Sequence, residues 1–270
     1  MDVAHCYLEG NADAVEFCLH DGYQHVLGAS TYTLQEGEQP IRAGSISLFD
    51  VNAEKGNLEL FHRVDTAGIF DIKWSTVGSN VGPLLAQADA DGYLRIYSLE
   101  GCSNEEKPRG SDDCKFSCWD MRDNPSGMVF QNSKVHKMGV CCIAKSPTDP
   151  NTILTGSYDE YLWVWDLRCI SRPVNETSVC LGGGVWRIKH HPFVSGLVLA
   201  ACMHNGFAIV KIGDKKPEVV EAYSQHGSLA YGADWQRAKL LPGGSTIVAT
   251  CSFYDRLLRV WRPKSDFCCI

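Results

Sequence analysis

The side chains that could do chemistry match few known catalytic patterns along the 270-residue chain. No G-x-S-x-G motif is present, so the strained turn that exposes the serine nucleophile of many hydrolases is absent. The glycine run at residues 181–185 lacks the lysine and the spacing of a phosphate loop, and a close approach of two backbones explains it better. His190 and His191 precede a proline with no third ligand at a recognised spacing, which predicts a loop between two strands and no metal site.

Cysteine is abundant, with 13 residues and no C-x-x-C pair. Cys202 and Cys251 are conceivable nucleophiles, but neither has a base beside it in the sequence, and we predict that both are buried strand cysteines. The first ten residues lack the basic and apolar segments of a signal peptide. We therefore expect a cytoplasmic protein whose cysteines are reduced.

The charge balance limits the partners and ligands. Acidic residues number 32 against 25 basic ones, without the basic clusters that a nucleic-acid surface needs. The most apolar stretch, residues 197–203, is far too short to span a bilayer. We expect no nucleic acid, no membrane, no metal and no cofactor.

A turn residue followed six positions later by the end of a strand recurs five times. The residues between them alternate or run apolar and are rich in aromatic and branched side chains, as in short strands. Two copies have an Asp-Gly or Asn-Gly turn, which suits a tight hairpin because both residues tolerate positive φ. The five pairs are Asp91/Tyr97, Asp113/Trp119, Asp159/Trp165, Asn205/Lys211 and Asp255/Trp261.

The spacing of these pairs predicts an all-β fold of propeller blades. Asp113 to Asp159 and Asp159 to Asn205 are each 46 positions, and Asn205 to Asp255 is 50. A period of about 40–45 residues with a terminal Trp-Asp pair, as at Trp165-Asp166, is typical of four-stranded WD-repeat blades. Two more strands are expected before each turn, at residues 68–74 and 84–88, 140–144 and 152–156, and 184–189 and 197–201.

The two ends of the repeat array are less regular. An earlier copy occupies residues 14–49, where a long polar hairpin at 35–39 replaces the tight turn, and residues 3–8 are expected to form the outer strand of the last blade. Asp91 to Asp113 is only 22 positions, and the segment between them, residues 100–110, is polar. We predict one propeller domain over residues 1–270, with five complete blades and a fragmentary blade near 100–122.

One set of polar residues recurs inside the repeats. His136, Thr155 or Ser157, Asp159 and Trp165 match by position the hydrogen-bonded network of WD repeats, and Asp255 and Trp261 occupy the same places in the last copy. A buried carboxylate needs charge-assisted partners, each worth about 1.5–3 kcal/mol. We therefore interpret these residues as structural.

The sequences between the repeat signatures resemble one family of WD-repeat proteins, the diphthine methyl ester hydrolases of diphthamide biosynthesis, called diphthine methyltransferases in older usage. The resemblance covers nearly the whole chain. It implies hydrolysis of the methyl ester on diphthine, the modified histidine of translation elongation factor 2, by a monomer without a cofactor. The runs that carry it are HKMGVCCIAKSP, GSYDEYLWVWDLR, GGVWRIKHHPF, VLAACMHNGF, YGADW and ATCSFYDRLLRVW, which start at residues 136, 156, 183, 198, 231 and 249.

The chain departs from this family in one respect. The family's ring has seven blades, whereas the segment between Leu99 and Ser111 is too short to hold the missing strands. The chain therefore resembles a shortened form. Three functions remain open: an esterase acting on a protein side chain, a non-catalytic WD-repeat adaptor, and an inactive shortened variant.

Ester hydrolysis needs a base, an activated water or nucleophile, and donors for the oxyanion. His204 is the first candidate base, because it lies in a repeat turn whose copy ends in Lys211 where others have Trp; an ordinary loop histidine explains it equally well. Trp186 and Arg187 start an inner strand and are candidates for substrate binding or for core packing. Tyr254 and Glu160 lie in equivalent turns and are candidates for catalysis and substrate binding.

Overall fold

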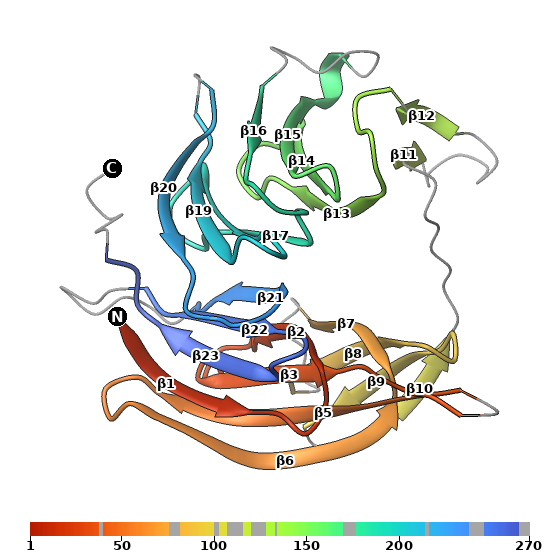
Figure 1. Cartoon of the computed structure of the whole chain (residues 1–270), viewed down its shortest axis with the longest axis vertical. Coiled ribbons are helices and arrows are strands. Elements are labelled where there is room, and N and C mark those ends of the chain that lie inside the picture. Colours follow the sequence, from red (N-terminus) through yellow and green to blue (C-terminus); the bar gives the residue numbers. More distant parts are fainter. Residues whose placement is uncertain are drawn as a thin grey trace. The chain divides into compact units, whose positions relative to one another are not determined.

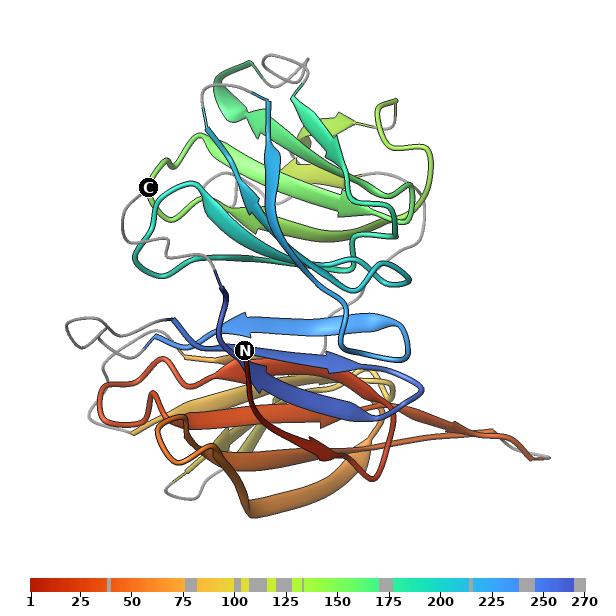
Figure 2. The same cartoon turned by 60° about the vertical axis from the view of Figure 1, so that its left-hand side comes forward.

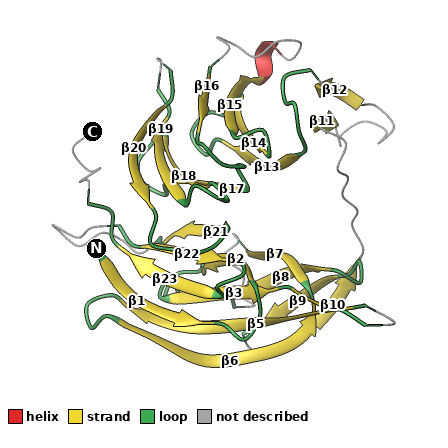
Figure 3. Ribbon diagram, viewed as in Figure 1, coloured by secondary structure: helices red, strands yellow, loops and turns green. Residues whose placement is uncertain are grey.

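The computed structural model describes residues 1–37, 40–75, 82–99, 103–106, 116–119, 128–132, 134–169, 177–213, 216–237 and 246–264. These residues are almost entirely strands and turns, apart from a 3-10 turn at Leu167–Cys169 (Figure 3). No described helix has the length and apolar character needed to cross a membrane. The chain divides into two compact units (Figure 1). Unit 1 comprises Met1–Arg109 and Gln225–Ile270, and unit 2 comprises Gly110–Ser224.

Unit 1 contains three antiparallel sheets, each a meander of four main strands. The short strand β4 (Thr33–Gln35) extends the hairpin with β5 beyond the rest of the first sheet (Figure 2). The first sheet is β2 (Ala12–Phe17), β3 (Val26–Thr31), β5 (Ile41–Asn52) and β6 (Asn57–Ala67); the second is β7 (Ile69–Trp74), β8 (Leu84–Asp89), β9 (Leu94–Ser98) and β10 (Ser103–Glu106); the third is β21 (Ala230–Trp235), β22 (Val248–Ser252), β23 (Leu257–Trp261) and β1 (Asp2–Tyr7).

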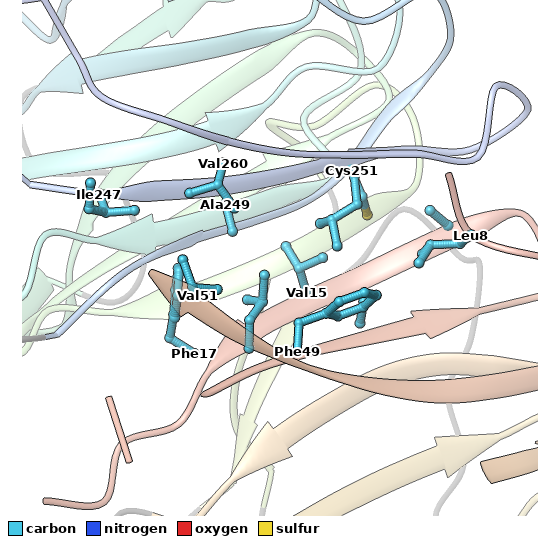
Figure 4. Close-up of a cluster of buried hydrophobic side chains, with 13 residues drawn as sticks. Leu8, Val15, Phe17, Phe49, Val51, Ile247, Ala249, Cys251 and Val260 are labelled. Atoms are coloured by element: carbon cyan, nitrogen blue, oxygen red, sulfur yellow. The ribbon is translucent and has the colours of Figure 1, made fainter. Parts of the chain in front are cut away.

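The N-terminal strand completes the C-terminal sheet, as the sequence predicts. β1 pairs antiparallel with β23, with Cys6 opposite Leu258, and the Leu8 amide donates to the Arg256 carbonyl at 2.8 Å. This pairing covers the edge of β23, which would otherwise expose a row of unpaired backbone groups. It also brings the two ends of the chain into one core (Figure 4), which includes Leu8, Val15, Phe17, Phe49, Val51, Ile247, Ala249, Cys251 and Val260.

Unit 2 contains two further four-stranded sheets and one hairpin. The core between the two sheets is built from alternate side chains of adjacent strands, with Leu154, Leu162, Val185, Val198 and Val210 at its centre. The sheets are β13 (Val140–Lys145), β14 (Thr152–Ser157), β15 (Tyr161–Asp166) and β16 (Ser178–Cys180), then β17 (Arg187–His190), β18 (Leu197–Ala201), β19 (Phe207–Lys211) and β20 (Glu218–Tyr223); the hairpin is β11 (Phe116–Trp119) with β12 (Met128–Asn132).

The predicted fold class is confirmed: the described residues form five blades of four main strands and one two-stranded fragment, all β. The strands expected before each turn are present within a few residues of their predicted bounds. Inside the polar segment at residues 100–110, Ser103–Glu106 forms the outer strand of the second blade, which the sequence analysis did not anticipate. Asp113 lies outside the described residues, and the single domain over residues 1–270 remains a prediction.

Candidate functional site

The polar residues predicted in the middle blade form one hydrogen-bonded chain. His136 Nδ1 lies 2.9 Å from Asp159 Oδ2, and its Nε2 lies 2.7 Å from Thr155 Oγ1. Trp165 Nε1 donates to the same threonine oxygen at 2.8 Å. Asp159 also accepts the amides of Lys137 and Tyr161, so the acid fastens the turn between β14 and β15 to the segment before β13. Because both imidazole nitrogens are hydrogen-bonded inside the blade, this histidine has a structural role.

The last blade holds a second network of the same kind, centred on His226. Its Nδ1 lies 2.6 Å from Ser252 Oγ and its Nε2 lies 2.9 Å from Thr250 Oγ1, which also accepts Trp261 Nε1 at 3.2 Å. The Ser252 hydroxyl donates to Asp255 Oδ1 at 2.5 Å. Burial lowers the pKa of His226 to about 4, so its imidazole is neutral at pH 7.

Sequence reasoning placed Asp255 and Trp261 in this network but missed His226. A usable signal exists, because a threonine, a serine two positions later and then an aspartate follow the histidine in both blades. The distance from histidine to tryptophan hides the match. Trp165 follows His136 by 29 positions, whereas Trp261 follows His226 by 35.

Most of the candidate site residues meet at one end of the two sheets of unit 2. There the segment at residues 181–186 packs between the turn at 158–160 and the turn at 202–206. The Leu181 amide donates to the Glu160 carbonyl at 2.9 Å, and Asn205 Nδ2 donates to the Leu181 carbonyl at 2.6 Å. The three segments therefore hold one another in place, as a functional site requires.

The glycine run makes this packing possible. A Cβ atom on Gly183 would lie 2.1 Å from the Cys202 carbonyl oxygen, and one on Gly184 would lie 2.6 Å from Met203 Sδ. Gly182 has a φ of +74°, which side chains with a Cβ rarely adopt. The predicted close approach of two backbones is thus confirmed, and the space above these glycines is filled by protein.

His204 lies in the turn between β18 and β19 and is exposed. Its imidazole makes no hydrogen bond or ion pair with the residues that the structure describes. The preceding residue, Met203, has a φ of 36°, and Glu160 in the equivalent turn has a φ of 72°. Positive φ in residues with a Cβ is costly and concentrates at functional sites. The turn thus presents the histidine to solvent on a constrained backbone.

Trp186 and Arg187 lie beside these turns. The Trp186 ring is half-buried, 5.9 Å from the ring of Tyr158 and tilted by 59°. Arg187 begins β17 opposite Ala201, and its charge acts on the nearby Cys142. The structure therefore brings Glu160, Trp186, Arg187 and His204 to one end of unit 2 through the contacts between their segments.

Tyr254 belongs to unit 1, in the turn between β22 and β23, and is 68% exposed. Its ring meets that of Phe253 edge to face, with centroids 5.0 Å apart. The ring centroid of Phe253 in turn lies 5.0 Å from that of Tyr231, the second residue of the inner strand of the same blade. The tyrosine is thus the outermost ring of a three-ring group.

Comparison with known proteins identifies the family. No family model matches the chain. A diphthine methyltransferase of Mus musculus is 30% identical over 327 residues, covering 84% of this chain and 68% of the relative. The Homo sapiens protein of the same name is 30% identical over 332 residues, covering 84% and 73%. The chain belongs to the diphthine methyltransferase family.

A solved structure supports the fold of this diphthine methyltransferase relative. A chain of the mitotic checkpoint complex matches it with a TM-score of 0.58 at 14% sequence identity, over 97% of this chain and 91% of that chain. At this identity the likeness concerns the fold alone, which fits the WD-repeat blades described above.

In this member of the diphthine methyltransferase family, Cys202, Cys251 and His191 are poor catalysts or ligands. Cys202 and Cys251 are fully buried, and burial raises the pKa of the Cys202 thiol to about 12, which keeps it protonated. His191 is buried in the loop after β17 and accepts two backbone amides on Nδ1, and burial lowers its pKa to about 4. Among the described residues no group of three or more metal-binding side chains assembles.

Proposed function

We propose that the chain hydrolyses the methyl ester of methylated diphthine on translation elongation factor 2, a late step of diphthamide biosynthesis. One observation carries the proposal: two relatives named diphthine methyltransferase match 84% of the chain. In this reaction water attacks the ester carbonyl carbon, and the bond from that carbon to the methoxy oxygen breaks. Methanol is released, and a free carboxylate stays on the substrate side chain.

The packing of unit 2 favours hydrolysis over transfer of a methyl group from a cofactor. A methyl donor such as S-adenosylmethionine needs a binding cradle, and the glycine run at residues 182–184 is one glycine-rich candidate for it. A Cβ atom on Gly183 would already lie 2.1 Å from the Cys202 carbonyl oxygen, so the backbone there is covered. These residues do not fit a nucleotide-like cofactor, whereas water requires no cradle.

In the proposed reaction His204 is the base. Its exposed imidazole takes a proton from the attacking water and returns it to the departing methoxide. The buried Cys202, the network-bound His136 and His226, and the backbone-bound His191 cannot do this, because their protons or lone pairs are committed. Glu160, Trp186 and Arg187 lie at the same end of unit 2 and are the candidates for substrate binding there, whereas Tyr254 belongs to unit 1 and is a separate candidate.

The test uses purified chain and elongation factor 2 that carries methylated diphthine. Mass spectrometry follows the loss of the methyl ester with time. We expect demethylation by the wild-type chain and a loss of about 10²–10⁴-fold in rate for His204→Ala, the usual contribution of general base catalysis. His62→Ala, which changes an exposed histidine of unit 1, serves as the matched control. If His204→Ala retains the full rate, the assignment of His204 as the base is refuted, whereas the proposed esterase activity stands.

A second candidate function is an inactive or adaptor form, which the fragmentary blade favours. The match to the Mus musculus relative spans 327 residues, more than the 270 of this chain, so at least 57 matched positions have no counterpart here. β11 pairs with β12 and with no other described strand. A folded chain that binds methylated elongation factor 2 without demethylating it would establish this alternative. We further propose that the protein is a cytoplasmic monomer that binds neither nucleic acid nor membranes.

A further inference from the structure

Three aromatic rings gather at one end of the last blade of unit 1. Tyr231 and Phe253 have ring centroids 5.0 Å apart with an interplanar angle of 44°, and Phe253 and Tyr254 have centroids 5.0 Å apart at 88°. Tyr254 is 68% exposed, and the other two rings are half-buried. We call this group the aromatic corner. The group therefore exposes mainly the ring of Tyr254.

The backbone holds the aromatic corner in a fixed shape. The register of β21 with β22 shifts between Ala230 and Gly232, so Tyr231 is the extra residue of a β-bulge. Bulges re-aim side chains and recur beside functional sites. On the other side the Phe253 amide donates to the Leu229 carbonyl at 2.9 Å, and the Tyr254 amide donates to Ser228 Oγ at 3.1 Å. Both segments of the aromatic corner are therefore held by backbone hydrogen bonds.

The charges next to the aromatic corner favour a cation. Asp255 follows Tyr254 directly; its carboxylate accepts Ser252 Oγ and the Gly227 amide and forms no ion pair with the described residues. His226 in the same network is neutral at pH 7. The Arg259 guanidinium is paired with Asp2 at 2.7 Å, which leaves the exposed Arg256 as the basic residue at this turn.

Two other aromatic groups are less suitable for a cation. Tyr32 and Phe70 stack with centroids 5.4 Å apart, but Arg42 Nε already donates to the Tyr32 hydroxyl at 3.0 Å. Trp186 is half-buried against Tyr158 and precedes Arg187 in the chain. Each of these groups has a positive charge beside it, whereas the aromatic corner has the Asp255 carboxylate as well as Arg256 in its turn.

We propose that the aromatic corner of Tyr231, Phe253 and Tyr254, together with Asp255, which follows Tyr254 in the chain, binds the trimethylammonium group of the modified histidine. The inference rests on the proposed function for the identity of the ligand. The positive charge of a quaternary ammonium is spread over its methyl groups and cannot donate a hydrogen bond. It is held by ring faces and a nearby negative charge, as in the aromatic cages that bind such cations.

Binding of a synthetic peptide tests the proposal without any need for hydrolysis. The peptide carries diphthine, and a matched peptide carries a neutral 3,3-dimethylbutyl group in place of the trimethylammonium group. Calorimetry on the full chain gives the dissociation constants. We expect Tyr254→Ala to weaken the diphthine peptide by about 3- to 30-fold, the range of a single cation–π contact, and Tyr254→Phe to retain most of the affinity. We expect tetramethylammonium chloride to compete with the diphthine peptide for the aromatic corner more strongly than sodium chloride does at the same ionic strength.

Phe70→Ala is the matched control, because it removes another exposed aromatic residue from unit 1 and leaves the aromatic corner intact. The proposal is overturned if Phe70→Ala weakens binding as much as Tyr254→Ala, or if the neutral peptide binds as tightly as the charged one. Circular dichroism melting verifies that each variant is folded.

The same variants separate this inference from the proposed function. If the chain shows no esterase activity but its binding of the diphthine peptide depends on Tyr254, the aromatic corner is supported and the proposed esterase function is refuted. Demethylation with an unchanged KM in Tyr254→Ala refutes the aromatic corner and leaves the esterase standing.

Discussion

At the scale of single residues, two histidines whose pKa is lowered by burial make the fold sensitive to acid. Burial lowers the pKa of His226 and of His191 from 6.5 to about 4. Below pH 6.5 these two histidines are protonated in the unfolded chain but stay neutral in the folded chain. The free energy of unfolding therefore falls as the pH goes from 6.5 towards 4. Urea titrations across this range measure the slope. We expect His226→Asn, which keeps polar partners and cannot titrate, to flatten it, whereas the exposed-site variant His62→Asn leaves it as in wild type. A slope that is equal in all three proteins would contradict the burial of His226.

At the scale of elements, local patterns predicted the strands well because each repeat turn and its flanking apolar residues lie within about a dozen positions. The Asp159 and Trp165 pair is one example. The outer strand β10 was missed because its sequence, SNEE, is polar, and only its pairing with β9 makes it a strand. The candidate site was harder to predict than the strands. The meeting of residues 158–160, 181–186 and 202–206 depends on which turns of neighbouring blades come together, and no local spacing encodes that.

The glycine run provides the prediction at this scale. In Gly183→Ala the new Cβ would lie 2.1 Å from the Cys202 carbonyl oxygen and 3.0 Å from the Asn205 amide nitrogen, so the turn that carries His204 must move. We expect a loss of about 1–3 kcal/mol in the free energy of unfolding, typical of overpacking, together with a lower rate of ester hydrolysis. Gly213→Ala is the control, because nothing lies within 4 Å of its new Cβ. Urea unfolding of both variants measures the difference in their free energies of unfolding. Equal values would show that the turn accommodates the new Cβ without cost.

At the scale of the whole molecule, unit 1 is assembled from the two ends of the chain, while unit 2 is continuous. β1 pairs with β23, and Leu8 enters the core shared by the first and last blades. Deleting residues 1–8 removes the outer strand of the last blade, exposes the edge of β23 and uncovers that core. We therefore expect hydrogen exchange to accelerate in β21–β23 and β2–β5, whereas β17–β20, whose ladders and core lie in unit 2, keep their protection. Hydrogen-exchange mass spectrometry resolves the two regions. Substituting Leu34, an exposed residue of the β4 strand in the same unit, by Ala is the control and is expected to leave both regions unchanged. Equal acceleration throughout the chain would mean that the two units unfold as one cooperative body, and the N-terminal strand would then stabilise the whole protein and not only unit 1.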